Sequence, residues 1–224
     1  AQTDHDQQTD LPTLTALSWT LDWDADGIEL GPDGSWSTNS DLGYTVTVSH
    51  AFIVTAAISL VPCTLEGDTG VFAWLSLLLG QPAFANHAVF EDVSLLELSA
   101  KEWLTPAKTV SLPSTSFPLT QYCSAYWLLA RGGPDSEFEH TSIELRGTWH
   151  HGDDTGSFDI TSDFARASIA NLSAIPVDTR QGHVTLTRPM ARLFDGIDFA
   201  KDNDYAIAWS VVHTMTEQAT FVLN

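Results

Sequence analysis

The chain has 224 residues, of which 29 are Asp or Glu and 9 are Lys or Arg, so its formal net charge is −20. An electrostatic field of that sign repels phosphate backbones and anionic membrane surfaces, which argues against nucleic acid as a partner. Hydrophobic residues make up 43% of the chain, enough for a core, and no apolar run reaches the roughly 18 residues that span a bilayer. We therefore expect one folded domain over 12–224, preceded by a flexible segment over 1–11, with no membrane span.

Apolar and polar residues alternate with a period of two along most of the chain, which predicts β-strands. The first run covers 14–21, and the acidic, glycine-containing stretch 24–27 predicts a turn after it. The stretch 44–61 is long and rich in β-branched residues, so it predicts two strands or one long bent strand. Many short strands separated by Gly, Pro and Asp turns predict a mainly β fold, a single-domain antiparallel β-sandwich or partly open barrel. The further expected strands are 122–130, 142–149, 157–160, 183–187 and 205–215.

Two stretches break the alternation and predict one or two short helices across a sheet end. The first, 71–79, is followed by a Gly and a Pro, which stop a helix. The second, 161–170, has Ser162 or Asp163 as a cap and apolar residues three to four positions apart. The proline-rich stretch 105–118 is expected to be a connection within the domain.

The location of the protein is indicated by its first residues and its cysteines. The start, 1–6, is small and polar, as in a mature chain from which a signal peptide has been removed. Cys63 and Cys123 lack C-x-x-C spacing, which favours one structural disulfide over a zinc or redox site. Closing that loop would contribute about 4 kcal/mol in the chain-entropy model, and two buried free thiols are the alternative. We expect a periplasmic, secreted or cell-surface protein.

The excess of acidic residues has two explanations. Charged residues are only 17% of the chain, and three of them are lysines, Lys101, Lys108 and Lys201. A dispersed carboxylate surface suits a halophilic protein, because concentrated salt screens its self-repulsion. The alternative is a surface that collects cations.

Catalytic motifs are missing from the sequence. There is no G-x-S-x-G, P-loop, H-E-x-x-H or G-x-G-x-x-G after a strand. A pair of carboxylates for glycoside hydrolysis is unconstrained when 29 acidic residues are available. We therefore expect a protein that is not an enzyme.

Histidine is the candidate metal ligand, because imidazole suits copper, zinc, iron and nickel where no thiolate is available. Adjacent strand residues point to opposite faces, so only one of His150 and His151 can enter an interior site. Ordinary hydrogen bonding or solvent exposure is the alternative explanation for each histidine. The eight histidines are His5, His50, His87, His140, His150, His151, His183 and His213.

Trp149 directly precedes this histidine pair. On a strand its indole projects on the same face as His151, two positions later. The alternative is that Trp149 only covers the core. Four other tryptophans lie in apolar runs and are expected in the core: Trp19, Trp74, Trp127 and Trp209.

Several short sequence motifs occur in a fixed order along 40–200. A strand region with a tyrosine is followed by a histidine-bearing connection, a Leu-x-Gly motif, a phenylalanine after a glycine turn, and a Leu-Phe-x-Gly motif. These correspond to 44–60, His87, Leu145-Arg-Gly147, Gly156-Ser-Phe158 and Leu193-Phe-Asp-Gly196. In this order the chain resembles the extracytoplasmic copper-binding family that includes MopE, CorA and MbnP. The predicted disulfide is a departure from that family.

Proteins of this family hold one copper ion, often as Cu(I), through two histidines and a kynurenine made by oxidising a tryptophan. The resemblance implies that Trp149 is the oxidised tryptophan and His151 one ligand. His87, in the equivalent connection, is then the second ligand, and His150 and His50 are the further candidates. The implied function is an exported protein that acquires, stores or delivers copper, with a copper donor or acceptor protein as partner. The sequence specifies no oligomeric state.

A calcium site is a second metal hypothesis. The spacing D-x-D-x-D-G over Asp22, Asp24 and Asp26, with Asp33 at the twelfth position, matches calcium-binding loops. The Gly-Pro after the loop excludes the exiting helix of an EF-hand. An acidic β-turn without calcium is the favoured interpretation.

A binding module without metal is the alternative function. In this interpretation a β-sandwich presents exposed tryptophans to a glycan or a protein partner. Trp23, Trp36 and Trp103 lie near predicted turns and would supply such a platform.

Overall fold

The computed structural model describes residues 14–62, 96–118, 121–134, 136–176 and 181–223. Within these ranges the chain forms twelve strands and one helix. In chain order they are β1 (Leu14–Asp24), β2 (Glu29–Leu30), β3 (Trp36–Asn39), β4 (Thr45–Pro62), β5 (Leu96–Trp103), β6 (Val110–Pro118), β7 (Gln121–Leu129), β8 (Ile143–His151), β9 (Asp154–Ser162), β10 (Arg166–Pro176), β11 (Gln181–Pro189), α2 (Asp204–Glu217) and β12 (Thr220–Leu223).

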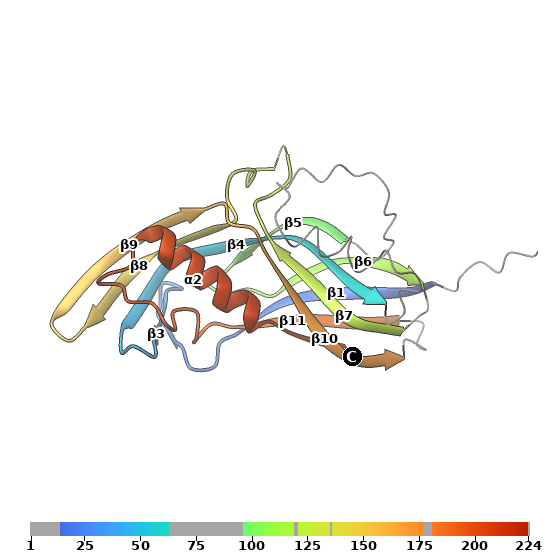
Figure 1. Cartoon of the computed structure of the whole chain (residues 1–224), viewed down its shortest axis with the longest axis horizontal. Helices are drawn as coiled ribbons and strands as arrows, with labels where there is room; N and C mark the ends of the chain where they lie inside the picture. The colour runs from blue at the N-terminus through green and yellow to red at the C-terminus, as the bar shows by residue number, and fades with distance from the viewer. Residues whose placement is uncertain (1–13, 63–95, 119–120, 135, 177–180, 224) are drawn as a thin grey trace, which may run out of the picture.

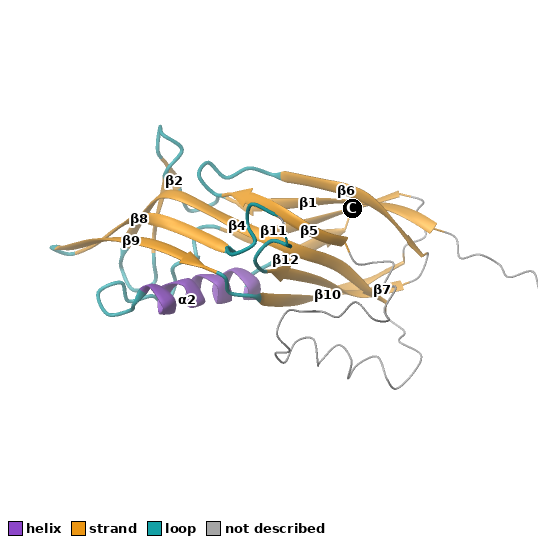
Figure 2. Cartoon of the chain, turned by 90° about the horizontal axis from the view of Figure 1, so that it is seen from above, coloured by secondary structure: helices purple, strands orange, loops and turns teal. Residues whose placement is uncertain are grey.

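Two sheets pack face to face, which confirms the prediction of a mainly β, sandwich-like fold (Figure 1, Figure 2). The smaller sheet has the strand order β12-β11-β1-β6. The larger, eight-stranded sheet runs β10-β7-β4-β3-β2, with β5 and β8 also paired to β4 and β9 paired to β8. One pair departs from the expected antiparallel arrangement, because β1 and β11 run parallel. In the described part of the chain, no helix has the length and apolar character needed to cross a membrane.

Strand β4 organises the larger sheet, and it is the single long strand that the sequence allowed for 44–61. Its first half pairs with β3 and β8, and its second half pairs with β5 and β7. Register shifts between Val48 and His50 and between Thr55 and Ala57 let the strand change partners. A β-bulge of this kind bends a strand and increases its twist. The hairpin β8–β9 is thereby carried to one end of the sandwich (Figure 1).

The core between the sheets contains Trp19 and Trp127, as predicted, and Trp74 lies outside the described residues. For three other tryptophans the predictions are wrong. Trp23 and Trp36 are 6% and 1% exposed, so they cannot present a platform to a glycan or protein. Both lie on the core side of strand segments, and the turns nearby do not expose them. Trp209, expected in the core, is 42% exposed.

A fully buried ion pair joins the two sheets. Arg188 in β11 pairs with Glu102 in β5, and both side chains are 0% exposed. Thr55 Oγ1 donates to Glu102 Oε1 over 2.5 Å, and Trp127 Nε1 donates to Thr55 Oγ1 over 2.8 Å. A buried charge is tolerated only with such partners, so this network fixes how the sheets face each other.

The predicted strand at 205–215 is wrong, because this segment forms the helix α2. Asn203 caps it, with Oδ1 accepting from Ala206 N over 2.9 Å, and Asp204 adds an acidic residue to the first turn. The buried side chains recur at helical spacing and cover β9 and β10 (Figure 2). They are Ile207, Ala208, Val211, Val212, Met215 and Thr216.

The predicted helix at 161–170 is also wrong. The segment contains the end of β9, a short bend and the start of β10. Ser162 Oγ accepts from Phe164 N over 3.3 Å at the bend, and β10 then pairs with β7. The stretch 105–118, expected to be a connection, contains β6, which pairs with β1. The helix predicted at 71–79 and the segment 1–11 lie outside the described residues.

Candidate metal centre

The hairpin β8–β9 carries the predicted tryptophan and histidine pair at its tip. A two-residue turn, Gly152 and Asp153, joins the strands, and the φ of Gly152 is +61°. This left-handed conformation favours glycine, which has no Cβ to clash. The last residues of β8, Trp149 to His151, therefore lie at one end of the larger sheet, beside the start of β4 (Figure 1).

Trp149 and His151 both contact Tyr44, so they lie on the same face of β8. The His151 ring stacks on Tyr44, with centroids 4.7 Å apart and an interplanar angle of 29°. The Trp149 ring meets Tyr44 edge-on, with centroids 5.6 Å apart and an angle of 82°. Trp149 also stacks on Phe199, which belongs to the core, at 6.3 Å. Tyr44 thus places an imidazole and an indole side by side.

His151 is exposed, and within the described part of the chain no hydrogen bond or ion pair reaches either of its ring nitrogens. Stacking on Tyr44 orients the ring while it leaves the nitrogens available. A neutral imidazole with a free nitrogen is a ligand for a borderline or soft transition metal.

His150 points to the opposite face, as expected of a neighbour on a strand. There it lines a pocket of about 420 Å³ together with hydroxyl side chains from β4, β8 and β9. Its cross-strand partners are Thr45 and Thr155. His150 and His151 are therefore not directed at one common position.

Behind the His151 ring, Tyr44 is held by a carboxylate. Tyr44 Oη donates to Asp198 Oδ1 over 2.6 Å, and Lys201 Nζ donates to Asp198 Oδ2 over 2.6 Å. The Lys201 hydrogen bond, followed by that of Tyr44, lowers the pKa of Asp198. The same carboxylate raises the pKa of Tyr44, because it accepts from the neutral hydroxyl. Tyr44 is therefore fixed as a neutral phenol.

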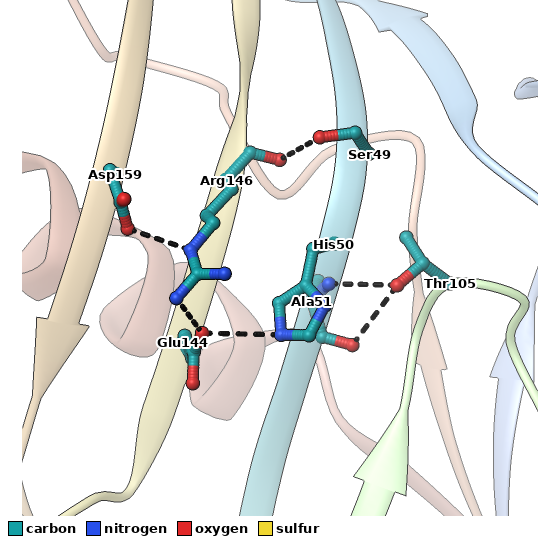
Figure 3. Close-up of polar contacts among 7 residues, drawn as sticks. All are labelled: Ser49, His50, Ala51, Thr105, Glu144, Arg146 and Asp159. Carbon is teal, nitrogen blue, oxygen red and sulfur yellow. Dashed lines mark hydrogen bonds and ion pairs between the residues drawn. The ribbon is translucent and has the colours of Figure 1, made fainter.

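His50 lies elsewhere, on the outer face of the larger sheet (Figure 3). Its Nε2 is 3.2 Å from Glu144 Oε1, which also pairs with Arg146 Nη2 at 2.6 Å. Arg146 Nε donates to Asp159 over 2.9 Å; this bond and the nearby charge of Glu144 raise the pKa of Arg146. His50 pairs with Arg146 across the strands, five residues from His151, or about 16 Å at roughly 3.3 Å per residue. The two histidines are too far apart for one ion.

The second expected ligand, His87, lies outside the described residues, as does Cys63. The disulfide of Cys63 with Cys123 therefore stays a prediction. Among the side chains that the structure describes, no group of three or more His, Cys, Asp or Glu is placed to hold a metal ion. Of the predicted copper-site pair His87 and His151 with Trp149, the structure describes His151 and Trp149, which lie on the same face of β8 against Tyr44.

In the acidic loop of the calcium hypothesis, three carboxylates accept hydrogen bonds from the chain itself. Asp24 Oδ1 accepts from Asp26 N over 2.9 Å, and Asp22 Oδ1 accepts from Thr109 Oγ1 over 2.7 Å. Asp33 Oδ1 accepts from the hydroxyl of Ser35 over 2.5 Å and from its N–H over 3.1 Å, which lowers the pKa of Asp33. The Asp24 and Asp33 bonds are typical of acidic turns, whereas the Asp22 bond joins the loop to Thr109, 87 residues along the chain. Calcium binding stays a prediction.

Tyr44 and Asp198 were not recognised from the sequence as parts of the site. A signal existed for Tyr44, since it begins the strand region that the family resemblance includes. Asp198 follows the Leu193-Phe-Asp-Gly196 motif by two residues. Their contact joins positions 154 residues apart, which no local pattern reports.

No protein-family model matches the chain, and no curated protein matches it. Among solved structures, the fold is distantly similar to MbnP from Methylosinus trichosporium, with a TM-score of 0.31 and 11% sequence identity. The match covers 78% of this chain and 76% of that one. The matched protein is one of the members of the family that the sequence resembles.

Proposed function

We propose that this protein is an exported, non-catalytic copper-binding protein that holds one copper ion beside the β8–β9 hairpin. His151 is one ligand, His87 is the second, and Trp149 is the neighbouring indole open to oxidation. The observation that carries this assignment is the exposed His151 ring, stacked on Tyr44 next to Trp149, with both nitrogens free of hydrogen bonds from the described residues.

The chemistry of the donor set fits copper. Two imidazoles bind Cu(I) or Cu(II), whereas hard cations such as magnesium prefer oxygen ligands. The net charge of −20 raises the local concentration of any cation near the surface. Tyr44 is held by its hydrogen bond to Asp198, and its stacking holds the His151 ring in one orientation. Residues outside the ligand set of a metal commonly orient the ligands in this way. A single exposed imidazole binds weakly, so tight binding requires the second histidine.

The role is acquisition, storage or delivery of copper outside the cytoplasm, with a copper donor or acceptor protein as partner. A bound copper ion supplies one-electron redox chemistry next to Trp149. The chain's own residues orient the imidazole, place the indole and keep Tyr44 protonated.

The test is copper stoichiometry and affinity for the full chain, measured by elemental analysis and by competition with a chromophoric Cu(I) chelator. We expect one copper per chain for the wild type, and a loss of tight binding in His151→Ala and in His87→Ala. His213→Ala is the matched control, since His213 is also exposed but lies on α2, and it should bind as the wild type does. Peptide mass mapping of Trp149 from natively exported protein reports its oxidation.

Unchanged stoichiometry and affinity in the His87→Ala/His151→Ala double variant would show that this site is not the copper site. No copper bound even in excess would refute the function itself.

A further inference from the structure

The outer face of the larger sheet contains an aromatic cage that surrounds a lysine. The cage consists of Phe52 in β4, Trp103 in β5 and Phe138 in the connection between β7 and β8. Lys101 Nζ lies 3.9 Å from the ring centroid of Trp103, 4.1 Å from that of Phe52 and 4.7 Å from that of Phe138. All three distances are within the ~6 Å at which a ring face attracts a cation. The ammonium group therefore sits where three attractive fields overlap.

The backbone holds this cage together without help from the lysine. Phe52 and Trp103 are a cross-strand pair, with centroids 5.6 Å apart. Phe138 is fixed within its own connection, because its carbonyl accepts from Gly132 N over 2.8 Å and from Thr141 N over 3.1 Å. The Phe138 ring lies 5.8 Å from that of Phe52. Replacing Lys101 should leave the three rings in position.

His50 forms the back of the cage. Its ring meets Trp103 at 5.4 Å and Phe52 at 6.1 Å, nearly perpendicular to both. On its other side, the imidazole Nε2 lies 3.2 Å from Glu144 Oε1, and Arg146 pairs with the same carboxylate (Figure 3). The His50 ring therefore packs behind the two rings, Phe52 and Trp103, that face the cation.

Lys101 makes no ion pair with any carboxylate that the structure describes, although Lys201 and Arg166 each make one and Arg146 makes two. This is notable in a chain with 29 acidic and 9 basic residues, where carboxylates are abundant. The ammonium group rests against aromatic faces instead. The cage is thus a favourable place for a cation even on a strongly acidic protein.

We propose that this cage is a binding site for a quaternary ammonium ligand, and that Lys101 is an internal occupant that the ligand displaces. A quaternary ammonium ion is less strongly hydrated than a lysine ammonium, so it loses less on entering the rings. The negative charge of the protein favours a cation over an anion or a neutral molecule. Lys101 is half-buried, and its ammonium group ends a flexible side chain, so this group can move into solvent. The ligand binds only when Lys101 has left the cage, so the apparent affinity of the wild type for the ligand is reduced in proportion to the fraction of molecules with an empty cage.

Calorimetric titration of the metal-free full chain with choline tests this proposal. Lys101→Ala should bind choline at least tenfold more tightly than the wild type. Lys108→Ala is the matched control, because Lys108 is an exposed lysine outside the cage, and it should behave as the wild type does. Adding Trp103→Leu to Lys101→Ala should abolish binding. The neutral analogue 3,3-dimethylbutan-1-ol, which replaces the nitrogen by carbon, should not compete.

A second measurement needs no variant. The three lysines of the wild type are acetylated, and the rate at each is followed by peptide mass spectrometry. Lys101 should be acetylated slowly, and choline should raise its acetylation rate. The acetylation rate of Lys108 should not change with choline. The proposal is overturned if folded Lys101→Ala binds choline no better than Lys108→Ala, if the neutral analogue binds equally well, or if choline leaves Lys101 acetylation unchanged. These outcomes are independent of the copper proposal, because the variants change only Lys101, Lys108 and Trp103, and none of these is a candidate copper ligand.

Discussion

Removing the negative partner of the ion pair between the sheets should be among the most destabilising conservative changes in this protein. In Glu102→Gln the shape is kept, but the guanidinium of Arg188 is left as an unpaired charge at 0% exposure. Breaking a buried pair in this way costs about 3–5 kcal/mol of the free energy of unfolding. At about 2–4 °C per kcal/mol for a chain of this size, the midpoint of thermal unfolding should fall by roughly 6–20 °C.

Urea denaturation followed by circular dichroism measures the change, with Glu217→Gln as the matched control. Glu217 also pairs with an arginine, Arg166, over 2.8 Å, but it is 60% exposed. Loss of a surface pair costs less than about 1 kcal/mol. The double variant Glu102→Leu/Arg188→Met should be more stable than Glu102→Gln, because it leaves no buried charge. A loss in Glu102→Gln no larger than in Glu217→Gln would refute the reasoning that the pair is a desolvated link between the sheets.

Two further predictions concern the strands around the hairpin. Gly147→Ala should lower the free energy of unfolding by about 1–3 kcal/mol, since a Cβ there would lie 2.1 Å from the carbonyl oxygen of Thr47. Gly133→Ala is the control in the same urea assay. Its Cβ would have its nearest contact at 3.7 Å, so the free energy of unfolding should change little. Tyr44→Phe should raise the pKa of the Asp198 carboxyl in an NMR titration, and an unchanged pKa would contradict the assignment. Because the pKa of Asp198 is lowered in the folded state, its ionised carboxylate stabilises the fold at a pH above the pKa that Asp198 has in the unfolded chain. This stabilisation is lost as the pH falls through the pKa of the folded state. Tyr44→Phe should therefore lose less free energy of unfolding on acidification than the wild type.

The period-two pattern was sufficient to predict half of the described strands, namely β1, β4, β7, β8, β9 and β11. Alternation reports which side of a strand faces the core, and this is a local property of the sequence. It also placed Trp149 and His151 on one face, where both contact Tyr44.

The pattern failed where local preference and tertiary contacts disagree. The β-branched residues of 205–215 favour a strand, but the Asn203 cap and the apolar spacing allow a helix, and packing on β9 and β10 makes that helix stable. At 161–170 the apolar spacing of a helix is present, but pairing with β7 satisfies the backbone as a strand.

The sequence by itself determined that this protein is acidic and mainly β, a sandwich or partly open barrel with candidate metal-binding histidines, because composition and alternation are carried by each residue and its neighbours. Only the tertiary structure decided which side chains meet. It buried Trp23 and Trp36, separated His50 from His151, and brought Tyr44 to Asp198 and Lys101 into its aromatic cage. These contacts join strands and connections far apart in the chain, and the pairing of such segments is fixed by how the whole core packs and not by any local pattern.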